Sequence, residues 1–293
     1  MWRLVAMMSF VMLIVQADEA RCEELCVCGW DEVFVLELSG RSPQKSWSWR
    51  ATDRPELPEE FRELFGTTDE CKPLEGGRKL LISSSGGGVA LVERPSGRVL
   101  WYGYVGNAHS IELLPHERVV VAGSTHENGN RLVVFDLAKP AEQLTTQELY
   151  SGHGVIWDDQ RGLLWALGFK DLNAYRLVDW VTPNPKLELV EVSELPDPGG
   201  HDLYPWPGTS NLIVTTSTKV FLFERDRREF RFYTELKDRA RVKGVAVHPV
   251  TGRVAYVQAD GENWWSTRIN FLNPEGSVPL PGERIYKARW VVP

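Results

Sequence analysis

Short apolar segments, each introduced by a polar turn, recur along the chain from residue 74 to residue 259. Five of them align without a gap, and they begin at Leu74, Leu114, Trp157, Trp206 and His248. Their starts lie about 40 to 50 residues apart, the period of repeats in which each unit is a four-stranded propeller blade. Each aligned segment therefore predicts a β-hairpin of one blade.

The residues around these segments supply the remaining strands. An inner strand precedes each segment, as in residues 109–114 and 243–248, and outer strands follow it, as in residues 131–137 and 219–225. The outer strands alternate apolar and polar positions, which suits a sheet with one buried face. This pattern accounts for five blades between about residues 68 and 285.

The two ends of the chain supply a sixth blade. Residues 25–30, 32–38 and 45–50 predict three strands that lack an inner strand, and residues 286–292 predict one strand that lacks a blade. Joining them closes the ring and removes a free sheet edge. The sequence thus predicts an all-β fold, a six-bladed β-propeller closed by strands from both termini, as one domain over residues 25–293.

Two segments depart from the strand pattern. Residues 57–66 predict a short helix, because Pro58 stands at its start, two glutamates fill its first turn and Gly66 ends it. Residues 1–17 predict an export signal, because an apolar stretch too short to span a bilayer follows Arg3 and small side chains lead to a cleavage point near Ala17. We therefore expect a secreted or periplasmic protein without an integral membrane segment after signal cleavage.

Four cysteines, Cys22, Cys26, Cys28 and Cys71, would remain after cleavage. Disulfides persist in exported proteins, so a bond from Cys26 or Cys28 to Cys71 is one reading. Buried free thiols are the other, and the sequence does not choose between them. A zinc site is not expected, because the spacing lacks a CxxC pair.

The charge of the chain limits its partners. A net charge of −7 argues against general binding of nucleic acids or anionic membranes, but it leaves room for a small anionic or carbohydrate ligand in a locally basic site. We expect a monomer. The GxSxG elbow, the phosphate-binding GxxxxGK[ST] loop and the GxGxxG fingerprint are all missing from the sequence.

Ionisable residues recur where the inner strands begin. In blade order these positions carry the following residues: Asp69 with Glu70, His109, His153, His201, Lys243 and Lys287. Because the inner strands of a propeller surround its central channel, their first residues converge at one mouth of that channel. The repeat thus predicts a ring of ionisable side chains, which is the best candidate for a functional site.

Three histidines on consecutive blades predict a metal centre. Neutral imidazole suits manganese, iron, nickel and zinc, so His109, His153 and His201, completed by Glu70, form a candidate shell for a divalent transition metal. An incomplete shell would leave one position for water or substrate. Two alternatives stay open: a metal-free catalytic or binding cluster, and histidines that only bond one another, the backbone and buried water.

The two lysines predict an anion site. Lys243 and Lys287 would repel a nearby metal unless an anion lay between, which points to a carboxylate, sulfate or phosphate group. In a catalytic reading Lys243 abstracts a proton, with its pKa depressed by the metal and Lys287, and Lys287 or Tyr204 assists the leaving oxygen. Packing within a strand is the alternative role of Tyr204.

Three further residues are candidates for substrate binding. Asp69 lies beside the predicted metal shell, Arg289 flanks the lysines, and Trp264 falls in a loop where its indole could stack on a sugar ring. The alternatives are a surface or inter-blade position for Arg289 and packing between blades for Trp264.

The motifs at residues 107–110, 152–155, 200–203 and 286–290 together resemble an uncharacterised family of exported bacterial six-bladed propellers. That resemblance covers nearly the whole mature chain and implies no activity. The type of site is similar, more loosely, to that of propeller polysaccharide lyases such as oligogalacturonate lyase, although those enzymes have a different number of blades. This second resemblance implies metal-assisted β-elimination from an acidic carbohydrate.

Two other functions fit the same residues. A metal-dependent lactone or ester hydrolase would need similar groups, and a propeller can also bind a glycan or a protein without catalysis. The sequence alone therefore leaves open whether the protein is an enzyme.

Overall fold

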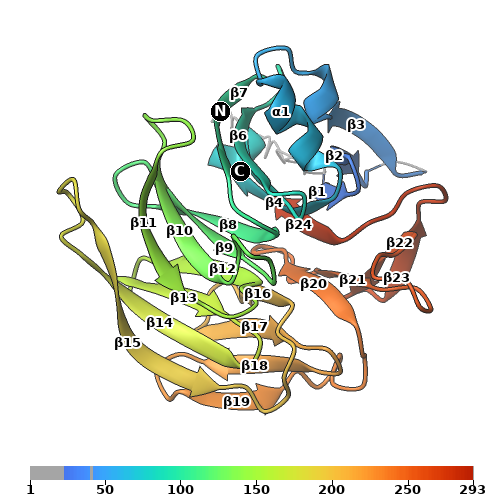
Figure 1. Cartoon of the computed structure of the whole chain (residues 1–293). Helices are drawn as coiled ribbons and strands as arrows, with labels where there is room; N and C mark the ends of the chain where they lie inside the picture. Colours follow the sequence, from blue (N-terminus) through green and yellow to red (C-terminus); the bar gives the residue numbers. More distant parts are fainter. Residues whose placement is uncertain (1–22, 40–41, 293) are drawn as a thin grey trace, which may run out of the picture.

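The apolar segments form strands that assemble into six antiparallel sheets of four strands each within residues 23–39 and 42–292, the part of the chain described by this computed structural model. The sheets are arranged around a common centre as the blades of a propeller (Figure 1). We number the blades from 1 to 6 along the chain, and the strands of each blade from the centre outwards.

The first three blades follow one another directly. Blade 1 comprises β4 (Thr68–Leu74), β5 (Lys79–Ser84), β6 (Gly88–Glu93) and β7 (Val99–Tyr104). Blade 2 comprises β8 (Ala108–Leu114), β9 (Arg118–Gly123), β10 (Arg131–Asp136) and β11 (Gln143–Glu148). Blade 3 comprises β12 (Gly154–Asp158), β13 (Leu163–Leu167), β14 (Asp171–Val178) and β15 (Lys186–Glu194).

The remaining blades complete the ring. Blade 4 comprises β16 (Asp202–Pro205), β17 (Asn211–Thr215), β18 (Val220–Glu224) and β19 (Glu229–Phe232). Blade 5 comprises β20 (Val242–Val247), β21 (Val254–Gln258), β22 (Arg268–Leu272) and β23 (Gly276–Pro279). Blade 6 comprises β24 (Lys287–Val291), β1 (Glu24–Gly29), β2 (Glu32–Glu37) and β3 (Gln44–Trp49).

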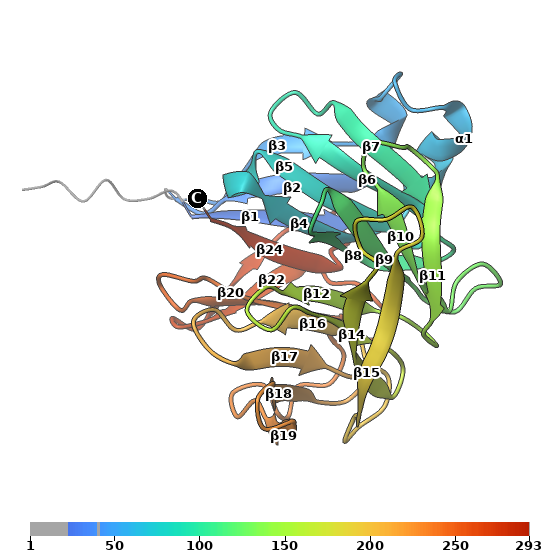
Figure 2. The ribbon, with the colours of Figure 1, turned by 90° about the vertical axis from the view of Figure 1, so that its left-hand side faces the viewer.

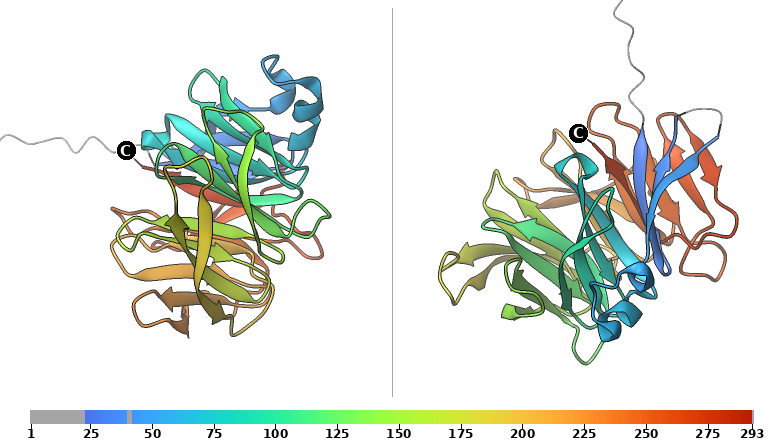
Figure 3. Two further views of the ribbon diagram at one scale, coloured as in Figure 1. Left: turned by 60° about the vertical axis from the view of Figure 1, so that its left-hand side comes forward. Right: turned by 90° about the horizontal axis from the view of Figure 1, so that it is seen from above.

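Blade 6 joins the two ends of the chain. Its inner strand β24 pairs antiparallel with β1, with Trp290 opposite Leu25. Figures 2 and 3 show the C-terminal strand beside the N-terminal strands. The predicted fold, a six-bladed β-propeller closed by strands from both termini, is confirmed.

The core consists of six hydrophobic clusters, one at each junction between neighbouring blades. The second strands of the blades are covered on both faces, and all six residues of β9 are buried. Strands covered on both faces are apolar throughout instead of alternating, which is why the aligned segments stand out in the sequence.

A helical linker joins blade 6 to blade 1. It contains the 3₁₀-helix η1 (Ala51–Asp53), the helix α1 (Glu59–Arg62) and the 3₁₀-helix η2 (Glu63–Phe65), and a further 3₁₀-turn, η3 (Glu75–Gly77), joins β4 to β5. The ring of Phe65 is buried edge-on against Trp49, with 5.3 Å between centroids, and this contact holds the linker on the core.

Three cysteines lie at the junction of blades 6 and 1 as free, buried thiols. Cys71 donates to the carbonyl of Cys26 at 3.4 Å, and Cys28 donates to the carbonyl of Lys287 at 3.7 Å. Burial raises the pKa of Cys28 and Cys71 well above the usual value, which keeps both thiols protonated. The sequence left open a disulfide or free thiols, and these three cysteines are free thiols. Cys22 lies outside the described residues.

The predicted export signal, residues 1–17, also lies outside the described residues and stays a prediction. No helix within residues 23–39 and 42–292 is long and apolar enough to cross a membrane.

The strand order decides which loops share a face with the predicted ring. All inner strands begin at one face, so the loops from second to third strands and from each outer strand to the next blade lie there too. We call this the mouth face. The loops from first to second strands and from third to fourth strands lie on the opposite face.

The closure of the ring depends on a close backbone approach at Gly29, the last residue of β1. A Cβ at this position would lie 1.9 Å from the carbonyl oxygen of Arg284. We expect Gly29→Ala to lower the free energy of unfolding by roughly 1–3 kcal/mol, because the clash is with backbone and cannot be relieved by a rotamer change. Urea denaturation measures the effect.

Gly276→Ala, in β23, is the matched control, because nothing lies within 4 Å of a Cβ there. Equal unfolding midpoints for the two variants would show that the backbones at Gly29 and Arg284 do not meet closely.

Candidate functional site

Five of the predicted ring residues, from blades 1 to 5, form a contiguous arc at the channel mouth. We call Asp69, His109, His153, His201 and Lys243 the mouth cluster. The imidazole of His153 lies between those of His109 and His201, with ring centroids 4.3 and 5.4 Å away. Nζ of Lys243 lies 3.1 Å from Nε2 of His201, and Nε2 of His109 lies 3.7 Å from Oδ1 of Asp69.

The histidines of the cluster are neutral. Burial lowers the pKa of His109 to about 4 and the pKa of His153 and His201 well below the usual range, and the charges of Lys243 and Lys287 lower all three further. Burial and the two nearby lysines thus favour the neutral form of all three imidazoles.

Backbone carbonyls orient two of these rings. Nδ1 of His109 lies 3.1 Å from the carbonyl of Asn107, and Nδ1 of His153 lies 2.9 Å from the carbonyl of Ser151. A neutral imidazole that donates from Nδ1 accepts at Nε2. The acceptor nitrogen Nε2 of His109 faces the carboxyl of Asp69, and within the described residues Nε2 of His153 remains an acceptor for another group.

Lys243 is an amine poised between its two protonation states. Burial lowers its pKa to about 8, and the charges of Arg241 and Lys287 act in the same direction. Within residues 23–39 and 42–292 it makes no ion pair with a carboxylate, and its bonded partner is His201. An amine with such a pKa can exchange a proton near neutral pH.

Asp69 also has a pKa near neutral pH. Burial raises its pKa to about 7, although its carboxylate accepts a hydrogen bond from the amide of Ser85. The carboxyl is almost fully buried, but 12% of the side chain of its neighbour His109 is exposed. A proton can therefore pass from Asp69 to the mouth through His109. The pair can supply a proton where the carboxyl alone cannot reach.

A second layer of charge fills the channel beneath the mouth cluster. Arg289 binds both oxygens of Glu70 at 2.8 and 2.9 Å and both oxygens of Asp202 at 2.9 and 2.6 Å. Nζ of Lys287 lies 3.1 Å from Asp202 and 3.5 Å from Glu70. These contacts cross the channel from blade 6 to blades 1 and 4, and two cations balance two carboxylates.

The ion pairs keep the second layer ionised. Burial alone would raise the pKa of Glu70 and Asp202, but Arg289 and Lys287 hold both values below the usual range. Farther along the channel Lys72 pairs with Glu112 at 2.8 Å. The centre of the propeller is therefore packed with paired charges.

Four predicted site residues are placed in or against this second layer and not with the mouth cluster. The oxygens of Glu70, predicted as a metal ligand, are occupied by Arg289. The side chains of Lys287, predicted as catalytic, and of Arg289, predicted to bind substrate, are almost inaccessible, at 0% and 1% exposed. The ring of Tyr204 lies 4.9 Å from Arg289, and burial raises its pKa to about 12.

Only part of the predicted metal shell is present in the structure. The three imidazoles are neighbours, but in the described part of the chain no group of three His, Cys, Asp or Glu side chains is arranged to hold a metal ion. Glu70 is committed to Arg289, so it does not complete the set. The metal stays a prediction.

Aromatic side chains connect Trp264 with the mouth cluster. Trp264 is 39% exposed and stacks on Trp30, with 5.1 Å between centroids and 12° between planes. Its edge contacts Tyr286 at 5.8 Å, and Tyr286 contacts His109 at 6.0 Å. Sequence reasoning gave neither Trp30 nor Tyr286 a role at the site, although Tyr286 begins the motif at residues 286–290.

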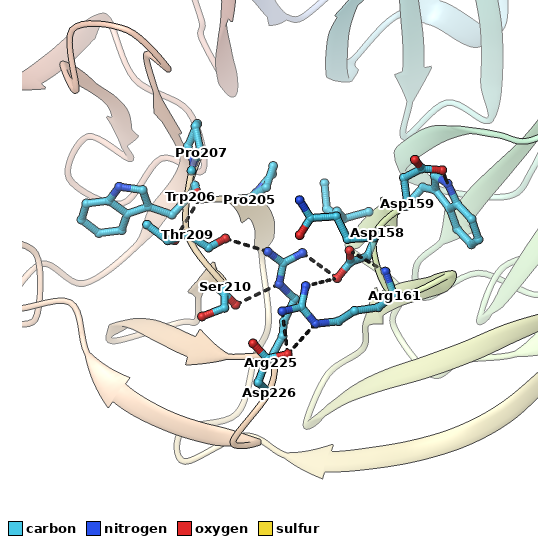
Figure 4. A pocket seen from close by; sticks show the side chains of 14 residues that line it. Asp158, Asp159, Arg161, Pro205, Trp206, Pro207, Thr209, Ser210, Arg225 and Asp226 are labelled. Carbon is cyan, nitrogen blue, oxygen red and sulfur yellow. Dashed lines mark hydrogen bonds and ion pairs between the residues drawn. The ribbon is translucent and has the colours of Figure 1, made fainter.

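The opposite face carries a pocket of about 530 Å³ between blades 3 and 4 (Figure 4). Arg225 there binds Asp158 at 2.7 Å and the carbonyls of Thr209 and Ser210, and Arg161 binds Asp158 and Asp226. Both guanidinium groups are satisfied by the protein itself. Three carboxylates, those of Asp158, Asp159 and Asp226, line the pocket against these two arginines, so it does not favour an acidic ligand and the mouth cluster is the stronger candidate.

The neutral histidines predict a pH dependence of stability. The folded-state pKa of His153 lies below its unfolded value of about 6.5, so below that pH the unfolded chain binds a proton that the native state excludes. Stability is therefore lost as the pH falls. A glutamine does not titrate, so we expect His153→Gln to gain stability relative to the wild type on acidification, by at most about 1.4 kcal/mol per pH unit.

Urea unfolding at neutral pH and near pH 5 measures this difference. The exposed His116→Gln serves as the control. A difference between His153→Gln and wild type that does not change with pH would contradict a neutral His153.

Comparison with known proteins agrees with the fold. Among solved structures, a crystal structure of a nidogen/laminin complex is similar, with 11% sequence identity and a TM-score of 0.63 over 92% of this chain and 98% of that chain. At this identity the similarity concerns the fold alone. No curated protein matches the sequence. Residues 34–293 match the family described as "Family of unknown function (DUF6528)", and the chain therefore belongs to this family of β-propellers.

Proposed function

We propose that the mouth cluster acts on an acidic carbohydrate by acid–base chemistry, most concretely by β-elimination next to a carboxylate. One observation carries this proposal: Lys243 is a nearly buried amine with a pKa of about 8, bonded to a neutral imidazole and without a carboxylate partner in the described residues. Paired lysines of a purely structural network, such as Lys287, have no such freedom.

The electrostatics favour an acidic ligand. The second layer is neutral in sum, because Arg289 and Lys287 balance Glu70 and Asp202. Within the described residues Lys243 has no carboxylate partner; it is positive below about pH 8, and Asp69 is neutral below about pH 7. A carboxylate is thus attracted to the mouth despite the net negative charge of the chain.

The proposed reaction uses two groups of the cluster. The neutral amine of Lys243 takes the proton from the carbon next to the carboxylate, the carbon–oxygen bond at the β position breaks, and a carbon–carbon double bond forms. The leaving oxygen receives the carboxyl proton of Asp69 by way of Nε2 of His109, the ring nitrogen that faces Asp69, and Asp69 is left as the carboxylate. Compared with the roles expected from the sequence, His109 and Asp69 replace Lys287 and Tyr204, which are not at the mouth.

Formation of the conjugated double bond tests the proposal directly. We expect polygalacturonate incubated with the protein to gain the ultraviolet absorbance of an unsaturated uronate. Because the base must be deprotonated and the acid protonated, the rate should follow a bell-shaped pH profile with limbs near pH 7 and 8. Binding of polygalacturonate without any new absorbance would instead support the non-enzymatic glycan-binding alternative.

The metal is tested separately from the reaction. If the three imidazoles hold a manganese, iron, nickel or zinc ion, elemental analysis of the wild type finds one equivalent and His153→Ala loses it. Acid release from a lactone or ester would favour the hydrolase alternative. Export of the protein, and with it access to extracellular glycans, rests on the signal predicted in residues 1–17.

A further inference from the structure

The mouth cluster is too closed to bind a sugar ring by itself. Asp69 is 1% exposed, and His153 and Lys243 are each 8% exposed. A ligand can therefore present only one functional group to the cluster. Most of its binding free energy must come from the surface around the mouth.

Two exposed aromatic side chains lie on the mouth face where blade 2 meets blade 3. Tyr150, in the loop from β11 to β12, is 63% exposed, and Phe169, in the loop from β13 to β14, is 43% exposed. Their rings meet edge to face with 5.9 Å between centroids, and the amide of Phe169 donates to the carbonyl of Tyr150. We call this pair the Tyr150 platform.

The Tyr150 platform lies across the mouth from Trp264. Tyr150 and Phe169 belong to the junction of blades 2 and 3, whereas Trp264 and its stacking partner Trp30 belong to blades 5 and 6. In a ring of six blades these two junctions are diametrically opposed. A ligand that touches both sides must therefore pass over the mouth cluster.

A pocket of about 450 Å³ adjoins Tyr150. Its lining includes Arg131, whose guanidinium binds the main-chain carbonyls of Gly129 and Glu127, together with the carboxylates of Glu127 and Glu148. Such a mixture of donors and acceptors beside an aromatic ring suits the hydroxyl groups of a sugar. Two lining charges are negative and one is positive, so the pocket is not an anion site.

Hydrogen bonds connect this pocket with the mouth cluster. Asn130, which also lines the pocket, accepts from the amide of Ser151 at 3.0 Å. The hydroxyl of Ser151 lies 3.4 Å from Nδ1 of His153. A ligand bound beside Tyr150 is thus held next to the proposed reaction centre.

We propose that the substrate is a glycan chain that crosses the mouth, with its flanking residues stacked on Trp264 at one side and on the Tyr150 platform at the other. This inference rests on the proposed function, since it places the reacting acidic residue over the mouth cluster. The chain is cleaved within its length, because both flanks are held.

Calorimetric titration of the inactive Lys243→Met protein with galacturonate monomer and with long galacturonate oligomers tests the inference. We expect affinity to increase with oligomer length. Replacing both Tyr150 and Phe169 by alanine should weaken binding of the long oligomer roughly 5- to 50-fold and leave binding of the monomer unchanged, and Trp264→Ala should act likewise.

Phe232→Ala is the matched control, because Phe232 is also 52% exposed but belongs to the outermost strand β19. Equal affinities for monomer and long oligomer, or full affinity of the Tyr150 and Phe169 variant for the long oligomer, would overturn the inference. Length-dependent binding without double-bond formation by the wild type would refute the proposed reaction and leave the chain-binding surface standing. Double-bond formation by the wild type together with equal affinities for monomer and long oligomer would support the proposed reaction and refute the chain-binding surface.

Discussion

Arg289→Met is expected to lower the free energy of unfolding by roughly 3–5 kcal/mol. The guanidinium makes four bonds to the carboxylates of Glu70 and Asp202, and all three side chains are at most 2% exposed. Removing the cation leaves two buried carboxylates with only Lys287 to compensate them. Because the pairs join β24 to blades 1 and 4, the loss also weakens the closure of the ring.

Urea denaturation at neutral pH measures this loss, and Arg176→Met is the matched control. Arg176 also pairs with a carboxylate, Glu188 at 3.2 Å, but its side chain is 61% exposed, so we expect a change of at most about 1 kcal/mol. Adding Glu70→Gln to Arg289→Met should recover part of the loss, because one unpaired charge disappears. A change in Arg289→Met no larger than in the control would mean that the second layer does not stabilise the fold.

Lys243→Met is expected to slow the proposed elimination at least 100-fold while the protein stays folded. The substitution removes the amine that takes the proton and keeps the length and packing of the side chain. Initial rates of double-bond formation from polygalacturonate measure the effect, and circular dichroism confirms the fold. The increase of the rate with pH, which reports deprotonation of Lys243, should disappear from any residual activity.

The control for this variant is Lys79→Met, since Lys79 is 35% exposed and paired with Glu75 on the surface. It should leave the rate unchanged. Full activity of Lys243→Met would remove Lys243 from the mechanism and with it the observation on which the proposed function depends.

The fold could be predicted from the sequence because its repeats are local. The five aligned segments form the turns and second strands of blades 1 to 5, and the unpaired strands at residues 25–50 and 286–292 had to combine. Strands buried on both faces give long apolar runs, and their period reports the size of a blade. No long-range information was needed for this step.

The mouth cluster was also within reach of the sequence. Once the repeats are aligned, Asp69, His109, His153, His201 and Lys243 occupy equivalent positions, and equivalent positions of a closed ring must converge. The sequence did not predict how deeply each of these side chains lies in the channel. Glu70 was predicted to bind a metal because it follows Asp69 at the same ring position, and Arg289 to bind substrate because it flanks Lys287, yet the two bind each other beneath the mouth.

The sequence by itself thus determined the number of blades, the closure by both termini and the ring of ionisable residues, because all three follow from a periodic pattern. Only the tertiary structure decided which of these groups form ion pairs and which have a pKa near neutral pH. Ion pairs such as Arg289 with Asp202 and the lowered pKa of Lys243 arise from burial and from partners on other blades. The stacking of Trp264 on Trp30 was also decided by the tertiary structure, since residues so distant in sequence meet only when the ring closes.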